Sequence, residues 1–256
     1  MSKPNISPAK VKQYEVKQSK YEHVSRLPTR SVINAASGLG KTVLIQNLIL
    51  DIYRGCFSIN FIFSPSIDLD DTFIPIKTYI DEELTKTKDE QIYFDDFDVE
   101  AVQHILTTQK RISDHQKKDP KTKKLFSILL LFDDVADNKA IHNNQALNSC
   151  FTRGRHSQIS TLLSTQKYNA VSTIIRTNMD SMYLFRLRNA NDLQAVIDEL
   201  SALLDKKILL QVYTKATEER YSFLCIKLTS PTIDDMFYVK FQSKIMINDE
   251  RIIQKI

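Results

Sequence analysis

Glycine is scarce in this chain. Only 4 of the 256 residues are glycine, where average usage of roughly 7% would give about 18. A chain this poor in glycine keeps it where the backbone requires a conformation that other residues avoid. Two of the four, Gly38 and Gly40, lie in one short loop, and Gly55 follows an apolar segment with helical spacing. The loop around residue 38 is therefore the first candidate for a functional site.

Paired cysteines and long apolar runs are also missing. The three cysteines, Cys56, Cys150 and Cys225, are odd in number and far apart, so we expect neither a disulfide framework nor a metal site, and they fit a reducing compartment. The longest apolar run spans residues 128–132, far short of the roughly 20 residues of a membrane-spanning helix. The first ten residues lack the apolar core of a secretory signal. We therefore expect a globular protein that neither crosses a membrane nor is secreted.

The net charge of +4 hides an uneven distribution. Residues 1–30 carry +5, from seven Lys and Arg against two Glu, and residues 110–124 carry +5, from seven against two Asp. Residues 81–100 carry −7, from nine acidic residues against two lysines. The basic segments can mark a surface that binds a polyanion such as DNA, or they can be solvated loops. Charge alone leaves both interpretations open.

Short apolar runs alternate with segments of helical spacing along the chain. Apolar or β-branched runs predict strands at 31–35, 58–64, 127–132, 160–164, 182–186 and 221–228, with 237–241 pairing at an edge. Helical spacing predicts helices at 43–54, 99–113, 140–153 and 191–204, and a short one at 79–85. This alternation indicates an α/β fold with a mostly parallel central sheet flanked by helices. We expect residues 1–27 to form a basic arm and residues 28–256 a single domain.

The glycine-containing loop lies between a predicted strand and a predicted helix. Glycines let successive backbone N–H groups turn toward an anion, and the helix N-terminus adds positive potential. The phosphate-loop (P-loop) pattern G-x-x-x-x-G-K-[ST] is met except that Ala35 replaces the first glycine, which is acceptable if its φ is negative. Lys41 would reach the β- and γ-phosphates of ATP, and the Thr42 hydroxyl would ligate Mg²⁺. The predicted ATP-binding residues are Ser37, Gly38, Leu39, Gly40, Lys41 and Thr42.

Two adjacent aspartates end the apolar strand at 127–132. The carboxyl ends of parallel strands line the ligand crevice of an open α/β sheet. Asp133 would therefore hold Mg²⁺, and Asp134 would polarise the attacking water. The alternative is a pair of polar residues that leave a strand or cap a helix. The second carboxylate favours hydrolysis of a nucleotide over mere binding of it.

Further candidates follow on the next strand. Gln166 ends the strand at 160–164, and its amide would point at the γ-phosphate if that strand lies between the P-loop strand and the Asp133 strand. Arg153 and Arg155 lie in the turn before this strand, where one of them could reach a neighbouring subunit's γ-phosphate as an arginine finger. A solvated basic turn is the alternative, and Arg176 is a rival for the finger.

Three segments in this order resemble the viral genome-packaging ATPases. Residues 35–42, residues 130–134 and above all residues 151–166, which run from Phe151 through Arg-Gly-Arg-His to Thr-Gln, carry the resemblance. These ATPases belong to the FtsK–HerA superfamily of DNA pumps and occur in nucleocytoplasmic large DNA viruses, virophages and Maverick/Polinton elements. The resemblance covers roughly residues 28–230. Aspartate at 134, where much of the superfamily has glutamate, is a departure.

The resemblance implies a RecA-like P-loop NTPase of the ASCE type, with the strand at 159–165 inserted between the P-loop strand and the Asp133 strand. It also implies a homo-oligomeric ring around double-stranded DNA, with ATP sites between subunits and Arg153 or Arg155 supplied in trans. The ring would drive a viral genome into a preformed capsid, so capsid components would be partners. We expect it in the host-cell cytoplasm or a virus factory, or with the virion.

Two other functions stay open at this point. The chain could be a DNA pump or helicase of the same superfamily that packages nothing. It could also be an assembly protein that changes shape on binding ATP and moves no DNA. A motor should hydrolyse ATP faster in the presence of DNA, whereas a shape switch needs only binding and slow hydrolysis.

Overall fold

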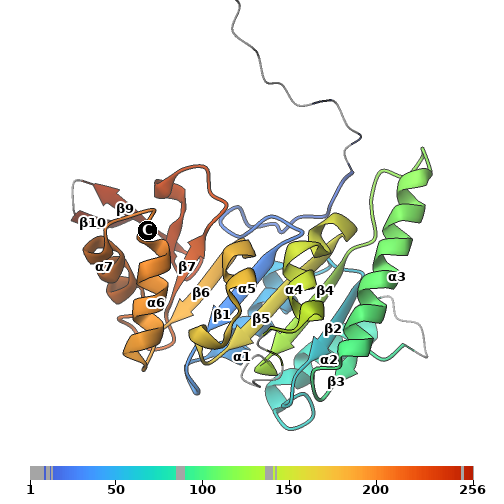
Figure 1. The fold of residues 1–256 in the computed structure, drawn as a ribbon, viewed down its shortest axis with the longest axis horizontal. Helices are drawn as coiled ribbons and strands as arrows, with labels where there is room; N and C mark the ends of the chain where they lie inside the picture. The colour runs from blue at the N-terminus through green and yellow to red at the C-terminus, as the bar shows by residue number, and fades with distance from the viewer. Residues whose placement is uncertain are drawn as a thin grey trace, which may run out of the picture.

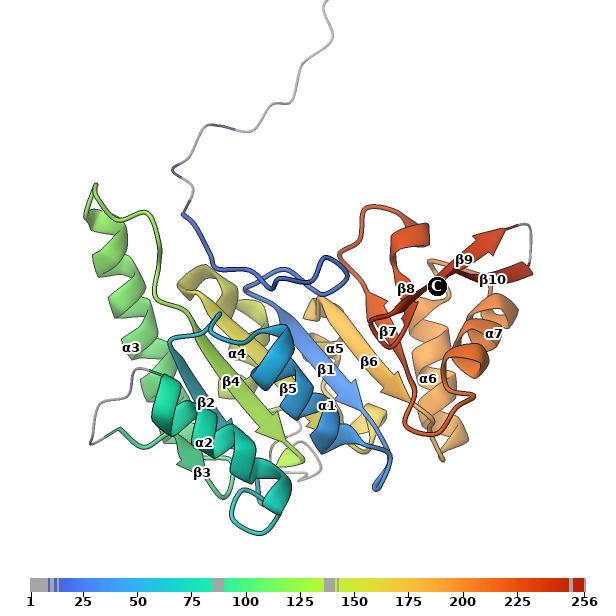
Figure 2. The ribbon, with the colours of Figure 1, turned by 180° about the vertical axis from the view of Figure 1, so that it is seen from behind.

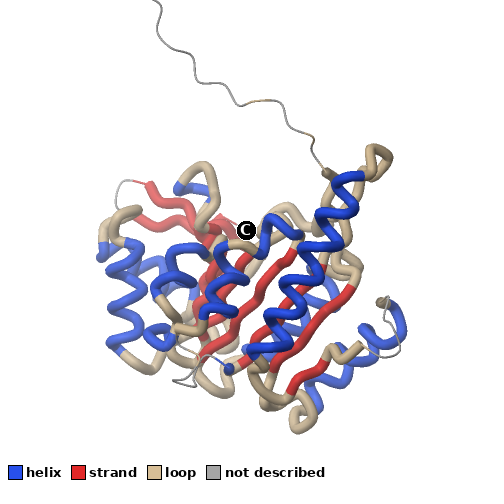
Figure 3. The backbone as a smooth tube through the Cα atoms, turned by 45° about the vertical axis from the view of Figure 1, so that its right-hand side comes forward, coloured by secondary structure: helices blue, strands red, loops and turns tan. Residues whose placement is uncertain are grey.

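The fold is known from a computed structural model, which describes residues 9, 12, 14–84, 90–135, 141, 143–248 and 251–255. One sheet of ten strands runs through the described part of the chain, with helices on both faces (Figure 3). The strands, in chain order, are β1 (Arg30–Asn34), β2 (Ile59–Phe63), β3 (Tyr93–Phe94), β4 (Ile128–Asp133), β5 (Ile159–Thr165), β6 (Ser181–Phe185), β7 (Phe223–Lys227), β8 (Phe237–Val239), β9 (Ser243–Asn248) and β10 (Arg251–Lys255).

The order of the strands in the sheet is β10-β9-β8-β7-β6-β1-β5-β4-β2-β3. The six strands from β6 to β3 are parallel, whereas β7 to β10 are antiparallel. The prediction of a mostly parallel α/β sheet is therefore confirmed. Strand β5 lies between β1 and β4, as the RecA-like, ASCE-type fold requires.

The antiparallel strands depart from the predicted arrangement. Residues 237–241 were expected at an edge, but β8 pairs with β7 on one side and with β9 on the other. That expectation is wrong because β9 and β10, which no pattern predicted, form a hairpin beyond β8.

Seven α-helices connect the strands of the described chain: α1 (Lys41–Asn47), α2 (Ile74–Glu83), α3 (Val99–Lys118), α4 (Gln145–Thr152), α5 (Thr173–Asn178), α6 (Ala190–Leu200) and α7 (Lys206–Ala216). Helix α1 continues into a π-helical turn, η1 (Leu48–Ile52). Helices α1 and α2 cover one face of the sheet, and α3, α4, α5 and α6 cover the other (Figures 1 and 2). No pattern predicted α7.

Several helix boundaries differ from those that the sequence predicts. Helix α2 begins five residues before the predicted start at 79, with Pro75 in its first turn, where a missing N–H is no loss. Helix α4 begins only at Gln145, because the Asn144 side chain accepts hydrogen bonds from the N–H groups of Ala146 and Leu147 and caps the helix there. Helix α6 ends at Leu200, not at residue 204.

The basic stretch at 110–124 is only partly a loop. Helix α3 runs from the Asp98 cap to Lys118, five residues past the predicted end. Its last turn contains His115, Lys117 and Lys118, and positive side chains there interact favourably with the helix dipole. The prediction of a basic loop is therefore wrong for residues 114–118, and Pro120 follows the helix.

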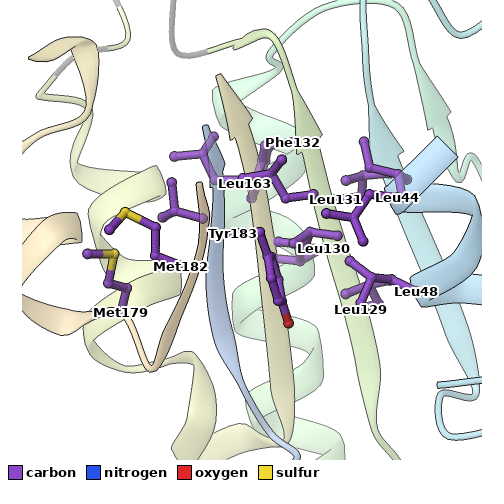
Figure 4. Packing of buried hydrophobic residues seen from close by; sticks show 14 of the residues in the cluster. Leu44, Leu48, Leu129, Leu130, Leu131, Phe132, Leu163, Met179, Met182 and Tyr183 are labelled. Carbon is purple, nitrogen blue, oxygen red and sulfur yellow. The ribbon is translucent and has the colours of Figure 1, made fainter. Parts of the chain in front are cut away.

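Strand β4 is the centre of the hydrophobic core. All six of its residues are buried, which is typical of a strand in a parallel sheet with helices on both faces. Leu129 and Leu131 face Leu44 and Leu48 on the α1 side of the sheet (Figure 4). This packing fixes the position of α1, and with it the P-loop, against the strand that ends in the two aspartates.

Residues 14–27 lie against the domain of the same chain. Val24 and Leu27 are buried, the backbone N–H of Glu15 donates to the carbonyl of Lys123 at 2.8 Å, and the Tyr14 hydroxyl donates to the carbonyl of Lys117 at 3.1 Å. The division of the chain into an arm (1–27) and a domain (28–256) stays a prediction. Among the described helices, none is both long and apolar enough to cross a membrane.

Candidate nucleotide-binding site

The P-loop joins the carboxyl end of β1 to the start of α1. Gly38 (φ 77°) and Gly40 (φ 96°) adopt left-handed backbone conformations, which explains why two of the four glycines are here. Ala35 is not among the residues with positive φ, and its N–H donates to the carbonyl of Thr165 on β5 at 3.1 Å. Alanine therefore fits the first position of the motif without backbone strain. The side chain of Leu39 packs against the hydrophobic core and anchors the loop.

Asp133 is held by two serine hydroxyls. It ends β4 and is 3% exposed. Ser64, which follows β2, donates to its Oδ2 at 2.9 Å, and Ser164 on β5 donates to its Oδ1. Because β2 and β5 flank β4, the sheet register brings both hydroxyls to one carboxylate. The sequence analysis missed both serines, although each lies at the carboxyl end of a predicted strand.

Asp134 lies in the left-handed region, with φ at 56°. Its N–H donates to the carbonyl of Ser164 at 3.1 Å, and the Gln166 amide donates to its Oδ2 at 3.3 Å. Its Oδ1 has no hydrogen-bond partner among the described residues. Burial raises the pKa of the Asp134 carboxyl above its ordinary value, although the nearby Lys41 ammonium opposes this effect. A partly buried carboxylate, with one oxygen unpaired among the described residues, is suited to bind a proton or a water molecule.

Lys41 connects the P-loop to both aspartates. Its ammonium lies 3.3 Å from Asp133 Oδ1 and also forms an ion pair with Asp134 Oδ2. The side chain is only 12% exposed. The structure thus brings together four predicted site residues from three elements, namely Lys41, Asp133, Asp134 and Gln166. Their chemical roles stay predictions.

A cavity of about 1230 Å³ opens beside this cluster. Five of the six predicted ATP-binding residues line it, namely Ser37, Gly38, Gly40, Lys41 and Thr42. The cavity extends along α1 and η1 as far as Ile52. Its other walls include residues 20–24, residues 66–72 and aromatic side chains of β6, β7 and the loops beside them. Arg188, which follows β6, donates to the carbonyl of Ser37 at 3.4 Å, and no pattern predicted this contact.

Arg153 and Arg155 lie at the amino ends of the parallel strands, whereas the cavity lies at their carboxyl ends. They lie in and beside the 3-10 turn η4 (Gly154–Ser157), which precedes the amino end of β5, and both are exposed. Strand β5 has seven residues, or about 20 Å at roughly 3.3 Å per residue, and its other end is at the cavity. Neither arginine can therefore reach the cavity of its own chain.

The rival arginine, Arg176 on α5, is engaged within the chain. Its Nε lies 3.1 Å from Glu199 Oε1, and its side chain is 15% exposed. Its guanidinium also lies over the ring of Tyr168, at 5.2 Å from the centroid. An arginine held by these two contacts is less suited than Arg153 or Arg155 to extend into another subunit.

The sequence also matches a known protein family. Residues 16–228 match the family described as Poxvirus A32 protein. The chain belongs to this family. One relative is the uncharacterized protein 075L of Invertebrate iridescent virus 6. The two sequences are 25% identical over 202 residues, which cover 77% of this chain and 70% of that protein.

Solved structures support the fold of this A32 family member. The genome packaging NTPase B204 of Sulfolobus turreted icosahedral virus 2, in complex with AMP, matches with a TM-score of 0.55 at 16% identity, over 82% of this chain and 96% of that chain. Segments of EssC from Geobacillus thermodenitrificans (ATPases 2 and 3) match with a TM-score of 0.55 at 13% identity, over 83% of this chain and 39% of that chain. The predicted RecA-like fold of a P-loop ATPase is therefore confirmed, and membership of the Poxvirus A32 family confirms the predicted viral family.

Proposed function

We propose that this protein is a Mg²⁺-dependent ATPase that translocates double-stranded viral DNA into a preformed capsid. The observation that carries the proposal is the cluster of Lys41, Asp133, Asp134 and Gln166 at one end of a cavity that the P-loop lines. Structures of the similar B204 protein are described as a genome packaging NTPase in complex with ATP-gammaS and with AMPPCP. Both the proposed nucleotide and the proposed packaging role of this chain rest on its similarity to B204.

The residues at the cavity fit a magnesium ion. Mg²⁺ prefers oxygen ligands and is usually held by one or two carboxylates together with substrate phosphates. The buried carboxylate of Asp133 and the hydroxyl of Thr42 supply oxygens on facing elements, and both residues line the cavity. No group of three or more His, Cys, Asp or Glu side chains that could hold a metal occurs among the described residues. This agrees with an ion that binds together with ATP, and the ion would neutralise charge on the phosphates.

In this proposal, Asp134 and Gln166 would act on the attacking water. The free Oδ1 of Asp134 can accept a hydrogen bond from water, while the Gln166 amide holds the other carboxylate oxygen. Lys41 pairs with both aspartates, so it must exchange these contacts for phosphate oxygens when ATP binds. Nucleotide binding would then release the two carboxylates for their roles at the metal and at the water.

A ring of identical subunits would complete the site. Arg153 and Arg155 are exposed and lie a strand length away from their own cavity. In a head-to-tail ring, one subunit's amino edge can face the cavity of the next subunit. We propose that one of these arginines acts in trans as the finger that stabilises charge on the γ-phosphate.

Mixing two inactive variants tests the arrangement in trans. Lys41→Ala removes the phosphate contact, and Arg153→Ala with Arg155→Ala removes both candidate fingers. Each variant alone should lose ATP hydrolysis by at least about 10³-fold. Mixed rings contain interfaces with one intact Lys41 and one intact arginine pair, so mixing should restore part of the activity. If the arginine variant keeps full activity in the assembled ring, the finger lies elsewhere, with Arg176 next.

Parts of the two basic segments meet on one surface, where Lys12 lies against the loop after α3. The Lys12 ammonium donates to the carbonyls of Asp119 and Pro120 at 3.4 and 3.3 Å, and the Lys117 ammonium donates to the carbonyl of His156 at 2.8 Å. We call this surface the basic edge, and its lysines are Lys12, Lys117, Lys118, Lys121, Lys123 and Lys124. It lies at the amino ends of the parallel strands, and we propose that it contacts the phosphates of DNA without reading the sequence of bases.

Salt dependence tests the basic edge. Charge reversal of its five lysines between 117 and 124 should reduce the slope of log affinity against log salt by about one for each lost phosphate contact. A matched control reverses Lys206, Lys207 and Lys215 on α7, which lie on a different element, and should leave the slope unchanged. An unchanged slope in the first variant would leave the basic edge as a solvated surface.

Steady-state hydrolysis of ATP tests the function as a whole. With Mg²⁺, long double-stranded DNA should raise the turnover number, and chelation of Mg²⁺ should abolish turnover. Tight binding of ATP without turnover would instead favour an assembly protein that changes shape on binding ATP. DNA stimulation without transfer of DNA into preformed capsids would favour a DNA pump or helicase that packages nothing. The proposed sites of action are the host-cell cytoplasm or a virus factory, or the virion, and fractionation of infected cells would show which.

A further inference from the structure

An aromatic residue at the cavity has an unusual backbone conformation. Tyr221, just before β7, has φ at 62°, a left-handed conformation that is rare for a bulky residue. Half of its surface is exposed (50%). A tyrosine that is both strained and exposed gains little from burial, and such residues often occur where a ligand binds.

The ring of Tyr221 lies beside the P-loop. Its Cδ1 would be 3.5 Å from a Cβ atom placed on Gly40, the residue that precedes α1. Phosphates bound by the P-loop would therefore end close to this ring, and the rest of the nucleotide must continue into the cavity that Tyr221 lines. A Cβ at residue 40 would only contact the ring, so the positive φ of Gly40, and not the room that the ring needs, accounts for glycine there.

The surroundings of Tyr221 form an aromatic wall. Phe185 and Phe223 pack against each other, with ring centroids 5.0 Å apart, and Phe223 contacts Phe241 at 5.3 Å. All of these residues line the cavity, but Phe185 and Phe223 are buried. Arg220 does not line the cavity, and its guanidinium lies 4.6 Å from the centroid of the Tyr221 ring. Tyr221 is thus supported from outside and exposed toward the cavity.

We propose that Tyr221 stacks on the base of the bound nucleoside triphosphate and that its left-handed backbone is retained for this purpose. The inference rests on the proposed nucleotide site. An aromatic ring stacks on any base, so this contact adds affinity for the nucleoside part without adding affinity for the phosphates. Tyr221 would thereby make the cavity a site for a nucleotide and not merely for a polyphosphate.

Paired titrations with ATP and inorganic tripolyphosphate test the role of the ring. Tyr221→Ala should weaken ATP binding by about 5- to 100-fold and leave tripolyphosphate binding unchanged. Tyr221→Phe keeps the ring and should bind ATP as the unaltered protein does. Leu210→Ala is the control, because Leu210 on α7 is an exposed apolar residue (46%) that does not line the cavity, and it should leave ATP affinity unchanged.

Tyr221→Gly separates the binding role from a structural one. Glycine adopts a positive φ without strain, so this variant should melt at a higher temperature than Tyr221→Ala while binding ATP equally weakly. Unchanged ATP affinity in Tyr221→Ala, or an equal loss for ATP and tripolyphosphate, would overturn the proposal. Failure of the nucleotide site itself would look different, because Lys41→Ala would then leave the affinity for both ligands unchanged.

Discussion

A basic side chain pairs with aspartate at both ends of the parallel strands, but only one of the two sites is fully hydrogen-bonded among the described residues. At the amino edge, the guanidinium of Arg30 donates to both oxygens of Asp180, at 2.9 and 2.5 Å, and to the carbonyl of Phe151 at 2.9 Å. At the carboxyl edge, Lys41 lies between Asp133 and Asp134, and one oxygen of Asp134 has no hydrogen-bond partner among the described residues.

The difference separates a structural role from a functional one. A bidentate arginine–carboxylate pair is geometrically complete, and it joins β1, α4 and the start of β6 at one point. The lysine cluster is incomplete, and it lies beside a large cavity. Buried charged groups usually have all of their partners, so an incomplete set that also lines a cavity favours a ligand site there.

The largest expected effect is at the incomplete site. Asp134→Asn should lower the turnover number for ATP by about 10²–10⁴-fold, because an amide cannot accept a proton from water. Asparagine tolerates a positive φ, so the fold should persist. ATP hydrolysis and thermal melting should be measured on the same sample. A variant that melts normally and still turns over ATP at the unaltered rate would contradict the role of Asp134.

At the fully hydrogen-bonded pair of Arg30 and Asp180, the expected effect is on the stability of the fold. Arg30→Met leaves Asp180 buried without a partner and should lower the free energy of unfolding by about 3–5 kcal/mol. The double variant Arg30→Met with Asp180→Leu should recover most of this loss. Urea denaturation measures both. As a control, Lys206→Met removes the exposed pair with Asp198 and should cost less than about 1 kcal/mol. Equal costs for Arg30→Met and Lys206→Met would contradict the structural role.

A smaller effect is expected at the serines that orient Asp133. Ser64→Ala removes the hydroxyl that donates to Asp133 Oδ2 at 2.9 Å. The Mg²⁺ concentration for half-maximal hydrolysis should rise by about 10-fold, because groups that orient a metal ligand affect metal affinity by roughly 10- to 100-fold. Ser58→Ala, at the other end of the same strand, should leave it unchanged. If both variants behave alike, the hydroxyl of Ser64 does not position the carboxylate.

The smallest expected effects are changes in the free energy of unfolding at two glycines. Gly40 lies at the carboxyl ends of the parallel strands and Gly154 at their amino ends. Gly40→Ala forces alanine into φ 96° and should lower the free energy of unfolding by about 1–2 kcal/mol. Gly154 does not have a positive φ, and a Cβ there would lie 3.4 Å from Ile159 Cβ. Gly154→Ala should therefore change stability by less than about 1 kcal/mol. Thermal melting of the two variants checks this, and a larger loss at Gly154 would reverse the comparison.

Much of the site could be predicted from local sequence. The order of a glycine-containing loop, a continuous apolar strand and a terminal Asp133-Asp134 pair is visible in the chain, because P-loops and buried parallel strands impose strict local patterns. Ser64 and Ser164 could not be assigned in the same way. Their hydroxyls meet Asp133 only because β2 and β5 flank β4, and a serine at a strand end has no distinctive pattern of its own.

The sequence by itself determined the α/β class, the P-loop and the strand that carries the aspartates, because burial and backbone geometry act on residues close in the chain. Only the tertiary structure decided the rest. It placed Arg153 and Arg155 at the end of the strands away from their own cavity, brought Lys12 beside residues 119–120, and brought Tyr221 beside Gly40. These contacts join residues that are far apart in sequence, and strand order, which no local pattern encodes, brings them together.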